Sequence, residues 1–81
     1  MQIGDKLQCK RNAFMEDKPL YIKNHFYKII DMGRNYKEFY DVRGEFKDHI
    51  FYEKWALLYY FYTPNEMRKN KLKELNKIKL N

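Results

Sequence analysis

Short runs in which apolar and polar residues alternate dominate the first three quarters of the chain, and such runs predict half-buried β-strands. In residues 6–10 the alternation turns Leu7 and Cys9 inward. Comparable strand signals occupy four later segments: 26–31, 39–43, 48–52 and 59–62. Turns are expected at residues 33–35 and at Gly44. Five short strands joined by turns predict a mainly β fold, a small barrel.

Two stretches of this part of the chain lack the alternation. Residues 11–24 show no clear period and contain Pro19 and Asn24, so a long loop is expected there, with a short extended piece at 20–22. Residues 55–58 are expected to form a single helical turn.

The pattern changes at Thr63-Pro64-Asn65-Glu66, which has the form of a capping box with proline at the first helical position. The Thr63 hydroxyl can accept a hydrogen bond from the Glu66 backbone N–H, and the Glu66 side chain can accept one from the Thr63 N–H. A single C-terminal helix is therefore expected from residue 64 to about residue 80.

The apolar residues of this helix predict how it contacts the barrel. Met67, Leu72 and Leu75 fall within one arc of the helix, so we expect docking through these three, with a last turn that frays or projects. The predicted organisation is a single domain in which residues 1–62 form the barrel and residues 63–81 the helix.

Composition restricts the class of protein. The chain has 81 residues, 15 of them Phe, Tyr or Trp, which supply a core without disulfides. Cys9 is the sole cysteine, which suits a reducing compartment. The longest apolar run, residues 55–62, is far too short to cross a bilayer. These features predict a soluble, cytoplasmic protein.

Positive charge gathers at the C-terminal end. The formal net charge is +6, and residues 64–81 hold six of the 17 Lys and Arg but two of the 11 Asp and Glu. Arg68 falls in the same arc as Met67, where its stem can extend over the barrel. Lys69, Lys73 and Lys77 follow one another at intervals of four and share the other helix face. Such a face suits nucleic acid or an acidic protein surface, and a solvated lysine-rich helix is the alternative.

Aromatic residues crowd the segment before the helix. In the predicted strand 59–62, alternation places Tyr60 and Tyr62 together on one face. This face is either covered by the helix or exposed as a contact surface for protein or single-stranded nucleic acid. The candidate partner-binding residues are therefore Lys69, Lys73, Lys77, Arg68, Tyr60 and Tyr62.

The sequence contains little that indicates an enzyme active site. Serine is absent, Thr63 serves as a helix cap, and Cys9 is expected in the core. His25 and His49 have no spacing diagnostic of a metal site, so we expect a non-enzyme without metal or cofactor. A small barrel ribonuclease remains an alternative, with His25, His49 or Arg43 acting on the phosphate.

Two segments carry a family resemblance. Residues 3–9, Ile-Gly-Asp-Lys-Leu-Gln-Cys, and residues 26–31, Phe-Tyr-Lys-Ile-Ile-Asp, resemble the first strands of small SH3-like barrels of bacterial and phage proteins. In those proteins a Gly-Asp turn begins the first strand and a Tyr-x-Ile strand returns after a long loop. Asn24-His25 stands where many have a glycine. The resemblance implies a binding module and no fixed activity.

The leading hypothesis is a phage or mobile-element accessory protein that binds a host protein or nucleoprotein complex and modulates or inhibits it, as anti-CRISPR proteins do. The abundance of Lys, Asn, Ile and Tyr, residues of AT-rich codons, suggests a low-GC bacterium or its phage. The alternatives are direct nucleic-acid binding through the basic helix and the ribonuclease.

Overall fold

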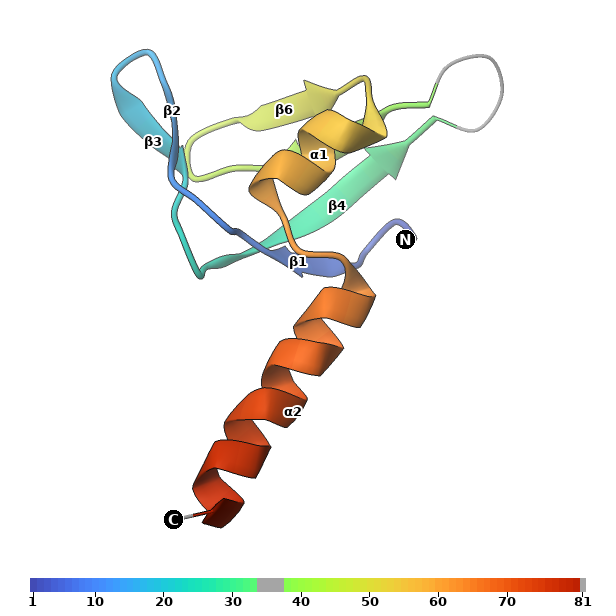
Figure 1. The fold of residues 1–81 in the computed structure, drawn as a ribbon. Coiled ribbons are helices and arrows are strands. Elements are labelled where there is room, and N and C mark those ends of the chain that lie inside the picture. The colour runs from blue at the N-terminus through green and yellow to red at the C-terminus, as the bar shows by residue number, and fades with distance from the viewer. Residues whose placement is uncertain (34–37, 81) are drawn as a thin grey trace.

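Six strands in two antiparallel sheets and two helices make up a computed structural model that describes residues 1–33 and 38–80 (Figure 1). The elements in chain order are β1 (Lys6–Gln8), β2 (Ala13–Met15), β3 (Lys18–Tyr21), β4 (Phe26–Met32), β5 (Tyr40–Arg43), β6 (Asp48–Phe51), α1 (Lys54–Tyr60) and α2 (Pro64–Leu80). The mainly β fold is thus confirmed, but the expectation of a single helix is wrong.

The larger sheet has the strand order β1-β4-β5-β6, with every pair antiparallel. These are four of the five predicted strands. Leu7 lies opposite Tyr27, and Ile29 lies opposite Val42; all four side chains are buried, so they define the core face. The residues between them point to the opposite, outer face.

Residues 11–24 contain a hairpin that the sequence analysis assigned to a long loop. β2 and β3 pair across a two-residue turn at Glu16 and Asp17, whose φ angles are 55° and 62°. Positive φ at both central residues matches a type I′ turn, which normally uses glycine or asparagine. The prediction was wrong because this turn carries neither signal. Pro19 is compatible because β3 belongs to a two-stranded sheet, where every strand is an edge.

The predicted fifth strand at residues 59–62 is also incorrect, because α1 continues to Tyr60. Leu57 and Phe61 are fully buried, and Ala56 and Tyr60 pack against the same core. Within the helix, Ala56, Leu57 and Tyr60 have the spacing of a helical stripe, whereas a strand would bury alternate residues. Core packing therefore extends the single helical turn expected here into a seven-residue helix.

After α1 the chain returns to the sheet at one point. Phe61 forms an isolated antiparallel bridge with Cys9, just beyond β1. The Tyr62 N–H donates to the Gln8 carbonyl at 2.9 Å and extends this contact. Of the predicted fifth strand, the structure has only this bridge and the adjoining hydrogen bond.

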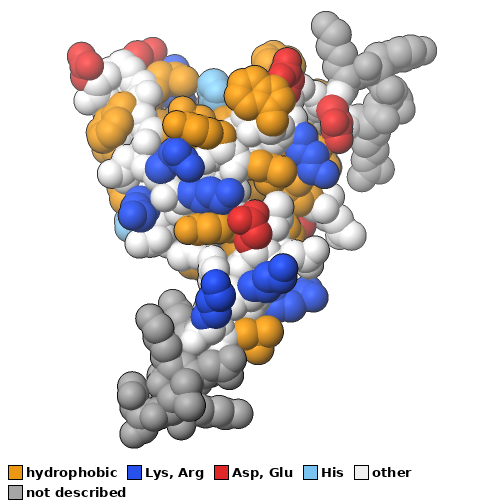
Figure 2. Space-filling model, viewed as in Figure 1, with side chains coloured by type: hydrophobic (Ala, Val, Ile, Leu, Met, Phe, Trp, Pro, Cys, Tyr) orange, Lys and Arg blue, Asp and Glu red, His pale blue; other side chains and the backbone are white. Residues whose placement is uncertain are grey.

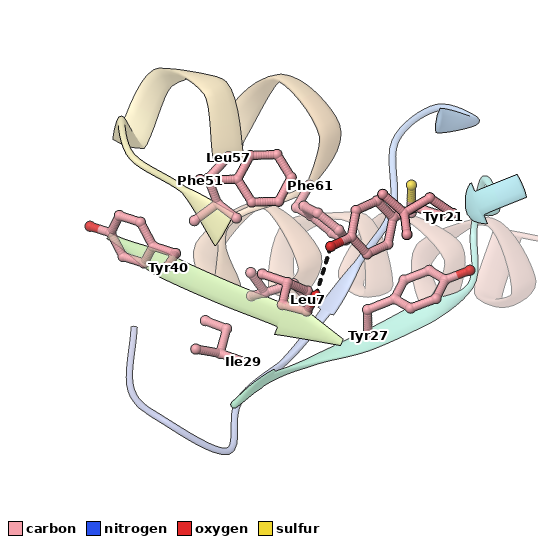
Figure 3. Close-up of a cluster of buried hydrophobic side chains, with 11 residues drawn as sticks. Leu7, Tyr21, Tyr27, Ile29, Tyr40, Phe51, Leu57 and Phe61 are labelled. Atoms are coloured by element: carbon pink, nitrogen blue, oxygen red, sulfur yellow. Dashed lines mark hydrogen bonds between the residues drawn. The ribbon is translucent and has the colours of Figure 1, made fainter. Parts of the chain in front are cut away.

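Aromatic side chains fill the space between the larger sheet, α1 and the hairpin (Figure 3). The fully buried Tyr21 makes edge-to-face contacts with Tyr27 and Phe61, each with ring centres 4.9 Å apart. Its hydroxyl donates to the Val42 carbonyl at 2.8 Å, so the buried polar group is satisfied. Leu7 and Cys9 are buried as predicted.

Gly44, where a turn was predicted, links the β5–β6 connection to β3. Its N–H donates to the Lys47 carbonyl at 2.9 Å, and the next residue donates to the Leu20 carbonyl. A Cβ on Gly44 would lie 2.6 Å from both the Leu20 side chain and the Lys47 carbonyl. Close backbone approach therefore requires glycine here. The other predicted turn, at residues 33–35, lies largely outside the described residues.

The helix start at the capping box is confirmed. The Glu66 N–H donates to the Thr63 hydroxyl and the Thr63 N–H donates to the Glu66 carboxylate, both at 3.1 Å. These two bonds satisfy groups that the first helical turn leaves without partners.

The predicted docking of α2 is correct for its first turn only. Met67 packs against the core, and its sulfur accepts a hydrogen bond from the Gln8 N–H at 3.3 Å. Leu72 is 55% exposed, so docking through this residue is wrong. The side chain of Leu75 lies outside the described part. Figure 1 shows α2 extending away from the sheets.

Candidate protein-binding surface

The outward side of α1 presents two large aromatic side chains to solvent. Trp55 is 69% exposed and Tyr59 is 51% exposed. They are four residues apart and therefore neighbours on the helix surface. The Trp55 indole N–H donates to the Glu53 carboxylate.

Arg11 covers the Tyr59 ring. Its guanidinium carbon lies 3.9 Å from the ring centre, a cation–π arrangement. Tyr59 in turn packs edge-on against Tyr60, with ring centres 4.9 Å apart and planes at 85°. Arg11, which follows β1, and the two tyrosines of α1 therefore form one continuous surface.

Two hollows adjoin at Tyr60, which lines both. One, of about 280 Å³, lies on α1 and is lined by Trp55, Ala56, Tyr59 and Tyr60. The other, of about 200 Å³, lies between the hairpin and the core, and Phe14, 67% exposed, stands at its wall. Figure 2 shows hydrophobic side chains among Lys and Arg side chains on the face where α1 lies. We call Trp55, Tyr59, Tyr60, Arg11 and Phe14 the aromatic surface.

The structure separates the residues that the sequence analysis grouped as candidates. Tyr60 belongs to the aromatic surface, although on a helix and not on a strand. Tyr62 is half-buried under Lys10, whose ammonium lies 5.3 Å from the ring centre. Lys10 also pairs with Glu66 at 3.6 Å, so Tyr62 lies at the junction with α2.

The basic candidates lie on the projecting helix. Arg68, Lys69 and Lys73 are exposed and line neither of the hollows that meet at Tyr60. The side chain of Lys77 lies outside the described residues. The basic candidate residues on α2 and the aromatic candidate Tyr60 therefore belong to different parts of the molecule.

Sequence reasoning missed Trp55, Tyr59, Arg11 and Phe14 as site residues. For the first two a signal existed, because aromatic residues four apart share a helix face; the strand assignment concealed it. No local signal marks Arg11 or Phe14, since their place beside α1 depends on how residues 11–24 fold.

Cys9 and His49 occupy buried or half-buried positions. The Cys9 thiol donates to the Arg11 carbonyl at 2.9 Å, and burial raises its pKa, which disfavours the reactive thiolate. The His49 ring packs on Phe51 with centres 4.8 Å apart, and burial lowers its pKa. His25 lies elsewhere, directly before β4, and lines a hollow together with Arg43.

Over residues 1–33 and 38–80, no group of three or more His, Cys, Asp and Glu side chains is placed to hold a metal ion. In the same residues, neither helix combines the length and the apolar character needed to cross a membrane. Comparison with known proteins gave no match among protein-family models, curated proteins or solved structures.

Proposed function

We propose that this chain is a small non-enzymatic binding module that docks a protein partner through the aromatic surface. The partner is a host protein or nucleoprotein complex, which the chain modulates or inhibits as an accessory protein of a phage or mobile element, in the manner of anti-CRISPR proteins.

One observation carries the proposal: an exposed tryptophan and an exposed tyrosine, with an arginine over the tyrosine ring, lie beside two hollows. Trp, Tyr and Arg are the residues most enriched where single side chains dominate binding energy. Exposed apolar patches often mark sites of protein–protein interaction. The Arg11–Tyr59 contact restrains the Tyr59 ring, which lowers the entropic cost of binding.

The aromatic surface is best suited to a partner that presents an apolar side chain flanked by acidic groups. Tyr60 and Phe14 line hollows that an apolar side chain can enter. Arg11 supplies positive charge at the rim, and among the described residues it forms no ion pair. An acidic partner would therefore gain electrostatic steering as well as contact area.

We further propose that the body is an SH3-like barrel. The order of elements supports it: a first strand, a long hairpin, three antiparallel strands, a short helix and a final contact back to the first strand. Small barrels of this kind serve as binding scaffolds and do not fix a chemical activity.

Affinity capture with matched variants tests the proposal. Immobilised wild-type chain, Trp55→Ala/Tyr59→Ala and Tyr52→Ala are each incubated with nuclease-treated lysate of a low-GC bacterium, and the captured protein is then purified and titrated. Tyr52 is 66% exposed but lines neither hollow, so it is the control. We expect the double variant to lose more than tenfold in affinity and Tyr52→Ala less than twofold. A partner that binds the double variant as tightly as wild type would refute the assignment.

Direct nucleic-acid binding through α2 is the second candidate. It is favoured by the exposure of Arg68, Lys69 and Lys73 on a helix that extends away from the body. In this candidate function, the cations of α2 would neutralise the phosphates.

A further inference from the structure

The outer face of the larger sheet carries a row of cations across three neighbouring strands. Lys6 on β1 lies directly opposite Lys28 on β4. Because Ile29 pairs with Val42 on the core face, Lys28 and Arg43 are the adjacent outward residues of β4 and β5. The row spans about 10 Å, the width of two strand spacings.

Few acidic side chains in the described structure neutralise the positive charge of this row. Like charges directly opposite each other on a sheet are destabilising. Among the described residues neither Lys6 nor Lys28 forms an ion pair, and Arg43 meets Asp48 only at 3.9 Å with both side chains exposed. An anion bound across the row would relieve the repulsion.

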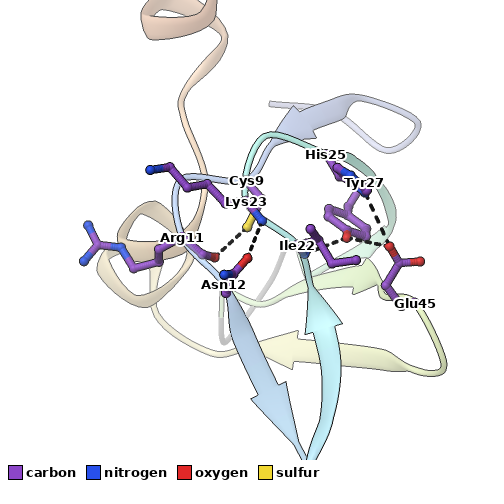
Figure 4. A network of polar contacts seen from close by, with 8 residues as sticks. All are labelled: Cys9, Arg11, Asn12, Ile22, Lys23, His25, Tyr27 and Glu45. Atoms are coloured by element: carbon purple, nitrogen blue, oxygen red, sulfur yellow. Dashed lines mark hydrogen bonds and ion pairs between the residues drawn. The ribbon is translucent and has the colours of Figure 1, made fainter.

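The row borders a hollow of about 320 Å³. One carboxylate lies in it, and that carboxylate already has partners: Glu45 accepts a hydrogen bond from the Tyr27 hydroxyl at 2.9 Å and lies 3.6 Å from the His25 ring (Figure 4). Lys6, Lys28 and Arg43 thus outnumber the single acid in the same hollow.

Phe26 stands between this hollow and a second one. It is 58% exposed and lines both. The second hollow, of about 510 Å³, lies between the sheet and α2 and includes Gln8, Asn70 and Lys71. A continuous path therefore leads from the three cations of the first hollow, past the Phe26 ring, to the second hollow. There it reaches the side-chain amides of Gln8 and Asn70 and the ammonium group of Lys71.

We call Lys6, Lys28 and Arg43 the cationic row. We propose that the path that begins at the cationic row binds single-stranded nucleic acid. Lys6, Lys28 and Arg43 contact backbone phosphates, and Phe26 offers its face to an unpaired base. Positively charged grooves with an aromatic stacking platform are the recurring solution for single strands, because every base has a π-face. The site lies apart from the aromatic surface and includes Lys71 of α2 but neither Lys69 nor Lys73, so one chain can hold a protein and a nucleic acid at once.

Fluorescence anisotropy with 20-nucleotide oligo(dT) and oligo(rU) tests the site at about 50 and 150 mM salt. The key pair of variants removes three cations each: Lys6→Gln/Lys28→Gln/Arg43→Gln and Lys69→Gln/Lys73→Gln/Lys77→Gln. Both carry the same net charge, so long-range attraction is matched. We expect the first to weaken binding at least tenfold and to flatten the slope of log K against log salt by about 0.7 for each phosphate that the variant no longer neutralises. The second should retain binding within threefold.

The ring is tested by Phe26→Ala, which should weaken binding about fivefold or more, while Phe26→Tyr keeps a ring and should restore it. Tyr52→Ala is the control, since Tyr52 is 66% exposed and lines neither hollow, and it should leave oligonucleotide binding unchanged. Equal loss in the two triple variants, no loss in Phe26→Ala, or no binding by wild type at the lower salt would overturn the proposal. Because none of these readouts uses Trp55 or Tyr59, the outcome is independent of the proposed protein-binding function.

Discussion

The guanidinium of Arg11 lies over the ring of Tyr59, 3.9 Å from its centre, and joins the segment after β1 to α1. The contact also fixes the ring that lines the hollow on α1. Since a cation over an exposed ring contributes about 0.5–1 kcal/mol, this pair helps define the surface without dominating the stability of the fold.

The coupling can be measured by a double-mutant cycle with Arg11→Gln and Tyr59→Leu. We expect the two effects on the free energy of unfolding in urea to be non-additive by about 0.5–1 kcal/mol. Strict additivity would mean that the two side chains do not interact in solution.

The reciprocal hydrogen bonds between Thr63 and Glu66 begin α2. Thr63→Ala removes the acceptor for the Glu66 N–H and should cost about 0.5–2 kcal/mol of stability. Thr63→Ser keeps an oxygen in place and serves as the control. An unchanged denaturation midpoint in Thr63→Ala, or an equal loss in both variants, would argue against a capping role.

The same motif makes stability depend on pH. The hydrogen bond from the Thr63 N–H, followed by the nearby Lys10, holds the pKa of Glu66 below its ordinary value of 4.5. Because the folded-state pKa is the lower one, this contribution is present above pH 4.5 and is lost as the pH falls through the folded-state value. Glu66→Gln retains an acceptor but does not titrate, so its stability should decline less steeply below pH 4.5. Parallel pH profiles of wild type and variant would contradict this.

Gly44 tests the close approach between the β5–β6 turn and β3. A methyl group there meets the Leu20 side chain and the Lys47 carbonyl at 2.6 Å, so Gly44→Ala should cost about 1–3 kcal/mol. Urea denaturation measures the loss. A variant as stable as wild type would show that β3 does not approach the turn this closely.

Strands with local signals were predictable, and elements that depend on distant packing were not. β1, β4, β5 and β6 followed from alternation, and α2 followed from its capping box. The Glu16–Asp17 turn and the length of α1 did not, because the first lacks glycine and the second is set by burial of Leu57 and Phe61.

The candidate site shows the same division. Tyr60 was predicted, since an aromatic cluster is visible in the sequence. Arg11 and Phe14 reach the aromatic surface through the chain path between β1 and β4, which no local pattern encodes. The cationic row was likewise hidden, because Lys6, Lys28 and Arg43 become neighbours only when the register of three strands is known.

Trp55 provides the most direct test of the central claim, because it is the sole tryptophan and its indole N–H gives one resolved NMR signal. The measurement is a titration of the ¹⁵N-labelled chain with the protein partner obtained by affinity capture. If the aromatic surface is the docking site, the Trp55 indole signal and the backbone amides of α1 shift or broaden most, while those of Lys6 and Lys28 stay in place. An indole signal that remains unchanged at saturation, with the largest shifts elsewhere in the chain, would contradict the proposed function.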